Sequence, residues 1–142
     1  MALSYDIKYI LVANTTLYAA VADRIYPVVA PEKPTLPCIV YNLDDIQTTE
    51  HKDAAFRWDV CSVTVTVISA TFPQAETLGA LVRTALNRYS ATISNDVIKT
   101  VNITGQSWEL VPDFSYAGSS GGVACFAVNT RCVIKIDTDI AE

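Results

Sequence analysis

The residues that could perform covalent or metal chemistry are few and are scattered along this chain. It has four cysteines and one histidine, and no two cysteines form a C-x-x-C pair. A zinc site would need closer ligand pairs, and a Cys–His nucleophile would have to use His51, which lies in a polar loop. Each cysteine sits in an apolar, strand-like run, so we expect reduced core thiols in a reducing compartment: Cys38, Cys61, Cys125 and Cys132.

Two further segments carry residue types that bind ions or phosphate. Asp44-Asp45 and the 50–53 segment contain carboxylates, but they lack the oxygen-ligand spacing of a calcium loop and fit a solvated acidic loop better. The glycine-rich run at 118–122 lacks the G-x-x-x-x-G-K-[ST] pattern and leads into a strand, so it has no helix N-terminus for phosphate. We therefore expect no catalytic, cofactor or metal site and no enzyme activity. The long loops suit contact with other proteins.

The composition predicts one globular domain over residues 1–142. Hydrophobic residues make up 51% of the chain and charged residues 18%, and the formal net charge is -5. Basic residues are not clustered, so a nucleic-acid surface has no electrostatic support. The first residues do not resemble a secretory signal, and no apolar run approaches the roughly 20 residues of a membrane span.

Segment 57–89 has the clearest periodicity and predicts a strand followed by a helix. Between 61 and 67, apolar residues alternate with serine and threonine, so one strand face should be packed and the other wet or in contact with a partner. Between 75 and 89, apolar residues recur at helical spacing. Thr71 and Gln74 have capping-box spacing, and Pro73 fits a first turn. We expect a helix of about 18 residues, roughly 27 Å long, as the only large helical cover of a small sheet.

The segment before this unit predicts two short helices and a stiff arm. The helices should span 4–13 and 17–22, separated by Asn14-Thr15-Thr16, which breaks the first and offers a cap to the second. Four prolines then fall between positions 27 and 37, which excludes a helix or a central strand there. We expect an extended arm that serves either as a contact surface or only as a rigid connector.

The remaining segments predict strands. We expect a strand at 38–43, a polar hairpin excursion at 44–55 whose base is strand and whose tip is mobile, and an antiparallel partner at 56–68. Further strands should cover 97–103 and 107–111, with a turn or bulge at Gly105-Gln106, and a turn should fall within 91–95. A loop at 112–123 precedes the longest strand, 124–136. The predicted fold class is α+β: a single antiparallel or mixed β-sheet with one long helix packed on one face plus short N-terminal helices.

The order of several short motifs resembles a known family. Arg24-Ile25-Tyr26-Pro27, then Ala30-Pro31, then Pro37-Cys38-Ile39-Val40-Tyr41 resembles the R-I-Y-P … A-P … L-P-Y-I-V-Y signature of bacteriophage tail completion proteins, the tail terminator family that joins tails to heads. The strand at 60–68, the helix start at 71–76 and the strand at 126–136 also look like that family. Cys38 stands where an aromatic is common, and the loops at 47–55 and 113–122 have no diagnostic counterpart, so partner contacts cannot be transferred there.

This resemblance implies a structural virion protein of the tail or neck, assembled in the host cytoplasm. It implies a six-fold ring that caps the tail tube, ends tube polymerisation and presents the docking surface for the head connector. The implied partners are further copies of the chain, the tail tube protein, the head connector and, in a contractile tail, the sheath protein. Genome DNA would pass through the lumen without specific binding, and no cofactor or membrane is implied.

Within this interpretation we expect three contact regions. The proline arm, from Tyr26 to Leu36, should reach a neighbouring subunit. The acidic loop from Gln47 to Asp53 should face the tube or the lumen. The loop at 114–122 should meet the other axial partner. The candidate interface residues are Tyr26, Pro27, Pro31 and Pro34 in the arm, Glu50, His51, Lys52 and Asp53 in the acidic loop, and Phe114 and Tyr116 in the last loop.

Two alternatives remain open at this point. The first is another neck or head-completion ring protein, or the tube or sheath terminator of a contractile particle. The second is a small ligand-binding or enzymatic α+β domain, which would need a deep pocket with convergent polar groups.

Overall fold

The computed structural model describes residues 3–21, 24–27, 36–50, 57–87, 91–93, 96–114 and 123–137. Within them lie three helices and six strands, in an order that begins with two short helices and places the third between β3 and β4. The elements are α1 (Leu3–Ala13), α2 (Thr15–Val21), β1 (Ile25–Pro27), β2 (Cys38–Glu50), β3 (Arg57–Ser69), α3 (Phe72–Leu86), β4 (Ala91–Ile93), β5 (Asp96–Phe114) and β6 (Val123–Asp137).

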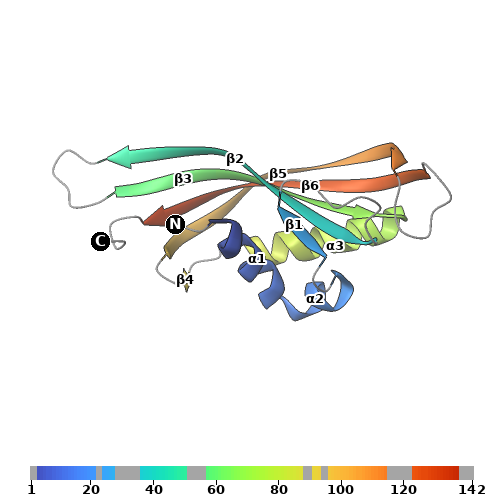
Figure 1. Cartoon of the computed structure of the whole chain (residues 1–142), viewed down its shortest axis with the longest axis horizontal. Helices are drawn as coiled ribbons and strands as arrows, with labels where there is room; N and C mark the ends of the chain where they lie inside the picture. Colours follow the sequence, from blue (N-terminus) through green and yellow to red (C-terminus); the bar gives the residue numbers. More distant parts are fainter. Residues whose placement is uncertain are drawn as a thin grey trace.

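The strands form one mixed sheet in the order β1-β2-β3-β6-β5-β4. Only the β1–β2 pair is parallel, and the other neighbours are antiparallel. Figure 1 shows the long strands as a twisted sheet with the helices gathered on one side of it. This confirms the predicted α+β class, including the long helix on one face and the short N-terminal helices.

Strand β3 carries the alternation that the sequence predicted. Its valines at 63, 65 and 67 are buried, whereas Ser62, Thr64 and Thr66 on the other face are half-buried. Apolar side chains of α3 cover the valine face, among them Leu78, Val82 and Leu86. The main core therefore lies between the sheet and the helices, where burial of a leucine-sized side chain contributes about 1.5–3 kcal/mol.

The helices α1 and α2 complete this core beside α3. Ile10 and Leu11 of α1 and Leu17 and Val21 of α2 are buried in the same cluster. Asn14 separates the two helices, and its Oδ1 accepts a hydrogen bond from the Leu17 backbone N–H at 3.0 Å. The predicted cap at this break is therefore confirmed.

A second, smaller cluster lies on the opposite face of the sheet. It buries apolar side chains at the end of the sheet where β2 begins, and half-buried residues pack around it. The face opposite α3 is thus apolar at this end and carries the serine and threonine hydroxyls of β3 further along. The buried members are Cys38, Ile68, Cys125 and Ala127, and the half-buried ones are Tyr26, Leu36, Val40 and Val111.

The predicted start and length of α3 need correction. Thr71 occupies the N-cap position, but its side chain makes no capping hydrogen bond. Instead, the buried Ser69 hydroxyl donates to Gln74 Oε1 at 2.5 Å and accepts from the Thr71 backbone N–H at 3.3 Å. Gln74 is therefore engaged by a residue before the cap, and the predicted capping box is wrong. The helix has 15 residues, not 18, because it ends at Leu86, with Asn87 as its C-cap in an extended conformation.

Three strand predictions also change. Residues 25–27 form β1, where no strand was predicted, and Pro27 is tolerated because β1 is an edge strand. Residues 91–93 form β4, which pairs with the start of β5 where a turn was predicted. Strand β5 is continuous from Asp96 to Phe114, and the irregularity predicted at Gly105 is a register shift within it.

Candidate protein-interaction surface

Arg24 holds the start of the proline-containing segment against the body of the domain. Its Nη2 donates to the Ala20 carbonyl in α2 at 2.9 Å, and its Nε donates to the Pro37 carbonyl at 2.9 Å. The Arg24 carbonyl in turn accepts from the Ile39 backbone N–H at 2.9 Å. One half-buried guanidinium thus ties α2, β1 and the start of β2 together, so the chain at Pro27 and at Leu36 is fixed at one edge of the sheet.

An exposed apolar patch lies near the other edge of the sheet. Phe72, at the first position of α3, is 43% exposed, and Trp108 and Leu110 of β5 are 51% and 57% exposed. The Phe72 and Phe126 rings meet edge to face, with centroids 5.7 Å apart and an interplanar angle of 81°. We call Phe72, Trp108, Leu110 and Phe126 the aromatic groove.

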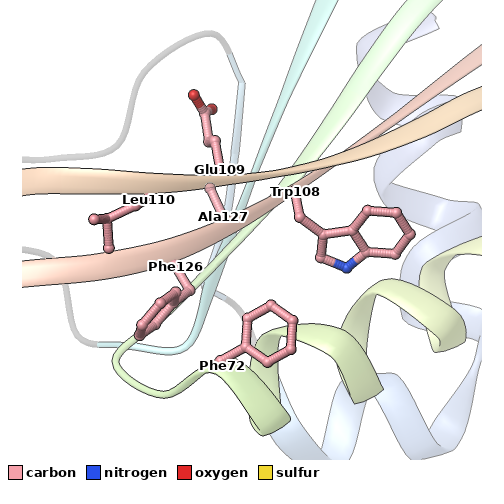
Figure 2. A pocket seen from close by; sticks show the side chains of 6 residues that line it. All are labelled: Phe72, Trp108, Glu109, Leu110, Phe126 and Ala127. Atoms are coloured by element: carbon pink, nitrogen blue, oxygen red, sulfur yellow. The ribbon is translucent and has the colours of Figure 1, made fainter.

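The register of β5 and β6 explains why these side chains gather. Trp108 pairs with Val128 and Leu110 with Phe126, so the side chains of all these residues lie on the face that α3 covers. Helix α3 begins at Phe72 and leaves that end of the face open. Figure 2 shows Phe72 and Trp108 on the helix side of β5, with Glu109 directed to the opposite side. The hollow lined by this group has a volume of about 220 Å³.

The groove adjoins a stretch of open strand edge. Among the described residues, β4 pairs with β5 only at Asp96–Ile98, so no neighbouring strand lies outside β5 from Thr100 onward. On the far side of the sheet, β1 pairs with β2 only at Ile39–Tyr41, and the outer side of β2 is equally open beyond that point in the described chain. Open edges offer unpaired backbone donors and acceptors, which favour pairing with another chain.

The face opposite α3 carries a hydrogen-bonded polar layer. Thr66 Oγ1 donates to Asn129 Oδ1 at 2.7 Å, and Asn129 Nδ2 donates to Glu109 Oε1 at 3.0 Å. Further along, Arg131 Nη1 donates to Ser107 Oγ at 3.1 Å. The polar side chains link β3, β6 and β5, so this layer suits a wet face and not a dry core.

The buried cysteines lack the surroundings of reactive thiols. All of them are buried, and none of them forms a disulfide bond. Burial raises the pKa of the Cys38 thiol to about 11, although the neighbouring Arg24 charge acts in the opposite direction. Burial also raises the pKa of the Cys132 thiol to about 12. These thiols are neutral at physiological pH and behave as small core hydrophobes, as predicted.

No cluster of metal-ligating side chains is found in the part of the chain that the structure describes. In the same part, the helices are too short or too polar to cross a membrane.

The predicted contact residues occupy separate places on the sheet. Tyr26 is half-buried against the second cluster, and Pro27 is exposed at the end of β1. Glu50 ends β2 and Phe114 ends β5, at opposite ends of the strands. The other predicted contact residues lie outside the described residues: Pro31, Pro34, His51, Lys52, Asp53 and Tyr116.

The sequence prediction missed the aromatic groove as a unit. The strand predicted at 107–111 puts Trp108 and Leu110, two residues apart, on one face, and the structure confirms this. The prediction gave no reason to bring Phe72 and Phe126 to the same place, because that depends on the pairing of β5 with β6 and on where α3 starts. The sequence feature that could have indicated the groove is Phe72 directly before Pro73. An apolar residue in the first turn of a helix, next to a proline, lies at the margin of the core and buries little of its surface there.

Comparison with known proteins identifies the fold and the family. A chain in the virion of a native gene transfer agent particle has a similar fold, with a TM-score of 0.65 and 16% identity, covering 92% of this chain and 91% of that one. No curated protein matches this sequence. The family model of the tail completion protein gp17 matches residues 9–116, which include α2, α3 and the strands from β1 to β5. The chain therefore belongs to the tail completion protein gp17 family and is a structural protein of a phage-type virion tail.

Proposed function

We propose that this chain forms a closed ring, of six copies, at the end of the tail tube. The ring ends tube polymerisation and provides the surface on which the head connector docks. The observation that carries the proposal is the unfinished sheet, whose β5 edge and β2 edge are both open over long stretches of the described chain. Because the two edges differ, contact between them is heterologous, and such a contact gives a ring when its rotation closes.

The ends of the strands support two different axial contacts. Glu50 and Phe114 lie at opposite ends of the sheet, so β2 and β5 end on opposite sides of the domain along the strands. In the proposed ring, one of these ends meets the tube and the other meets the head side. One face of the proposed ring reproduces the interface through which tube subunits stack. The other face lacks this interface, so no further tube subunit can add.

The proposed role is geometric and not enzymatic. Each subunit contact would bury on the order of 800 Å² per partner. The net charge of -5 suits a lumen through which DNA slides without sticking. A ligand-binding function is less well supported, because the aromatic groove, at about 220 Å³, is smaller than the roughly 300–1,000 Å³ of ligand pockets and is lined mainly by apolar side chains.

Disruption of the gene in the phage, followed by electron microscopy of lysates, tests this function. We expect overlong tails that lack heads, restored to normal length by the wild-type gene in trans. Normal-length free tails would indicate instead a neck or head-completion component. Normal, infectious particles would contradict both roles.

A point-mutation test addresses the head-side contact. The Phe114→Ala/Tyr116→Ala variant should fold normally and yield particles with unjoined heads and tails, because aromatic side chains frequently anchor protein interfaces. Circular dichroism checks the fold and electron microscopy checks joining. If this variant assembles normal particles, the loop after β5 is not the docking surface.

A further inference from the structure

Two exposed apolar side chains lie on the same face of the sheet, at its two open edges. Leu43 of β2 pairs with the buried Val63, so it lies on the face that α3 covers, and it is 43% exposed. Trp108 is exposed on the same face of β5. Two strands separate β2 from β5 and adjacent strands lie about 4.8 Å apart, so the two side chains do not meet within one copy. Each of them is therefore open to a second chain.

Rotation about the axis of the proposed ring brings the β2 edge of one copy beside the β5 edge of the next. Because the strand ends face the tube and the head in that ring, the strands run along its axis, and the rotation preserves their direction. Within one copy β2 and β5 run in opposite directions, since three successive antiparallel pairs separate them. The two edges would therefore pair antiparallel, with the α3 faces of both copies on the same side.

The lengths of the two edges leave few registers. Beyond β1, the β2 edge runs over 42–50, and eight of these residues pair with β3 because Asp44 is bulged. Beyond β4, the β5 edge runs over 100–111, and eleven of these residues pair with β6. Pro112 has no backbone N–H and ends this stretch. Eight positions fit within eleven in only four registers.

The faces of the strands reduce the four registers to two. Leu43 would lie opposite position 107, 108, 109 or 110 of the next copy. Directly opposed residues share a face, which excludes Ser107 and Glu109, because their side chains form hydrogen bonds on the face opposite α3. In the first remaining register Leu43 lies opposite Trp108, and in the second it lies opposite Leu110. Both registers place Leu43 at the aromatic groove.

Arg131 brings a positive charge to the β5 edge on the opposite face. It belongs to β6, but its Nη1 donates to Ser107 Oγ of β5 at 3.1 Å. A Cβ added at Gly105 would lie 2.8 Å from Arg131 Nη2, so the absence of a side chain there leaves room for the guanidinium over the edge strand. A carboxylate on the paired edge of the next copy would lie beside this guanidinium.

The charge of Asp45 selects one of the two registers. Asp45 is exposed on β2, on the face opposite α3. In the first register it lies opposite Ser107, beside the Arg131 guanidinium. In the second register it lies opposite Glu109, and like charges directly opposite each other destabilise a sheet. Electrostatic complementarity therefore favours the first register.

We propose that Leu43 of one copy packs into the aromatic groove of the next copy in the ring, opposite Trp108, while Asp45 pairs with Arg131 on the other face. The contact joins the sheets of neighbouring copies, with an apolar pair on one face and an ion pair on the other. This inference rests on the proposed ring and names the contact that closes it.

The edge strand β1 limits the contact at one end. It covers β2 at 39–41, so β1 of the neighbour stands level with positions 110–112 of β5. Strand β5 has to turn away from it there, and the register between β5 and β6 shifts after Val111. Such irregularities bend a strand out of regular pairing. The paired stretch therefore runs from this point towards β4.

Disulfide crosslinking of the full chain tests the pairing directly. Leu43→Cys combined with Trp108→Cys should join neighbouring copies under mild oxidation by copper and dissolved oxygen, and a closed ring should give covalent hexamers on non-reducing gels. A bond within one copy is excluded, since linked Cα atoms lie within about 7 Å of each other. The matched control is Leu43→Cys combined with Ser107→Cys, because a shift of one residue moves the second thiol to the other face.

The crosslinks are measured both in the purified chain and in particles assembled with the variant in place of the wild-type chain. Both substituted side chains are exposed, so the variant should fold, and the native cysteines are buried. Absence of crosslinks through Trp108→Cys in particles with completed tails would overturn the contact. Equal crosslinking through Ser107→Cys would overturn it as well.

Charge reversal gives a second, independent test. Asp45→Arg and Arg131→Asp should each raise the concentration needed for self-association roughly tenfold, because like charges then face each other across the contact. The variant with both changes should associate within roughly threefold of the wild-type chain, since the ion pair is restored with its signs exchanged. Sedimentation measures association and circular dichroism checks folding. A folded double variant without recovery would contradict the ion pair.

Failure of the contact and failure of the proposed function give different results. If tails are completed while the crosslinks and the recovery are both absent, the contact is wrong and the proposed function stands. If gene disruption leaves tails and heads normal, the proposed function itself fails.

Discussion

Arg24, the first residue of the R-I-Y-P segment, stabilises the fold through its hydrogen bonds and does not take part in a reaction. Replacing it with methionine keeps most of the aliphatic stem but removes the donors to the Ala20 and Pro37 carbonyls. We expect the free energy of unfolding to fall by about 2 kcal/mol, the range for hydrogen bonds made by a charged donor. Urea denaturation of the full chain measures this.

A matched control lies on the exposed side of α3. Arg83 is exposed in the last turn of that helix, so Arg83→Met should change the free energy of unfolding by less than about 0.5 kcal/mol. Equal losses for the two variants would show that Arg24 does not tie these segments together.

The buried thiols predict how stability depends on pH. The pKa of Cys38 is raised from 9.0 to about 11 by burial, so the folded chain keeps this proton at a pH where the unfolded chain has lost it. The unfolded state then binds fewer protons, and the stability that is complete below pH 9 falls as the pH rises towards 11. Urea denaturation between pH 8 and 11 should show a shallower fall for Cys38→Ala than for the wild-type chain. Parallel curves would contradict this.

At the scale of single residues, the sequence indicated which residues would form hydrogen bonds better than it indicated their hydrogen-bond partners. The spacing of Thr71 and Gln74 satisfied the capping rule, yet the Ser69 hydroxyl takes Gln74 instead. Ser69 is the last residue of β3, and the pairing of that strand buries it beside the start of α3. No local pattern contains that information, because it depends on how the strand end and the helix meet.

At the scale of elements, α3 lies unusually close to β6. A Cβ added at Gly79 would lie 2.7 Å from Val128 Cγ1 and 3.2 Å from Val128 Cβ. Gly79→Ala should therefore destabilise the chain by about 1 kcal/mol, because the strain of overpacking exceeds the helix propensity that alanine gains. Thermal or urea unfolding measures the change.

The Val128→Ala background tests the cause. The Val128→Ala change removes the 2.7 Å contact with Cγ1 but keeps Cβ at 3.2 Å, so Gly79→Ala should destabilise this background clearly less than it destabilises the wild-type chain. A destabilisation of the same size in both backgrounds would show that the contact with β6 is not responsible.

Elements with a strong repeating pattern were predictable, and short edge strands were not. The alternation in β3 and the helical spacing in α3 each extend over many residues, so their faces could be assigned before the fold was known. Strands β1 and β4 have three residues each, too few for a period to emerge, and their pairing is set by the neighbouring strand. The aromatic groove depends on such pairing and was missed for the same reason.

At the scale of the whole molecule, the patch at the open edge of β5 predicts separate effects on folding and assembly. Leu110 is 57% exposed, so Leu110→Lys should change the free energy of unfolding by less than about 1 kcal/mol. It should weaken self-association at least roughly tenfold, because a lysine at a strand edge opposes edge pairing and would be desolvated in the contact. Sedimentation over a range of concentrations measures association.

A lysine elsewhere on the same strand separates charge from position. Asn102 is exposed on β5, outside the aromatic groove and on the opposite face of the sheet, so Asn102→Lys adds the same charge to the open edge without entering the groove. It should associate like the wild-type chain and restore tail completion when supplied to a phage that lacks the gene, whereas Leu110→Lys should do neither. If Leu110→Lys rings form normally and Asn102→Lys rings do not, the subunit contact lies at the β4 end of the strand and the aromatic groove serves another partner.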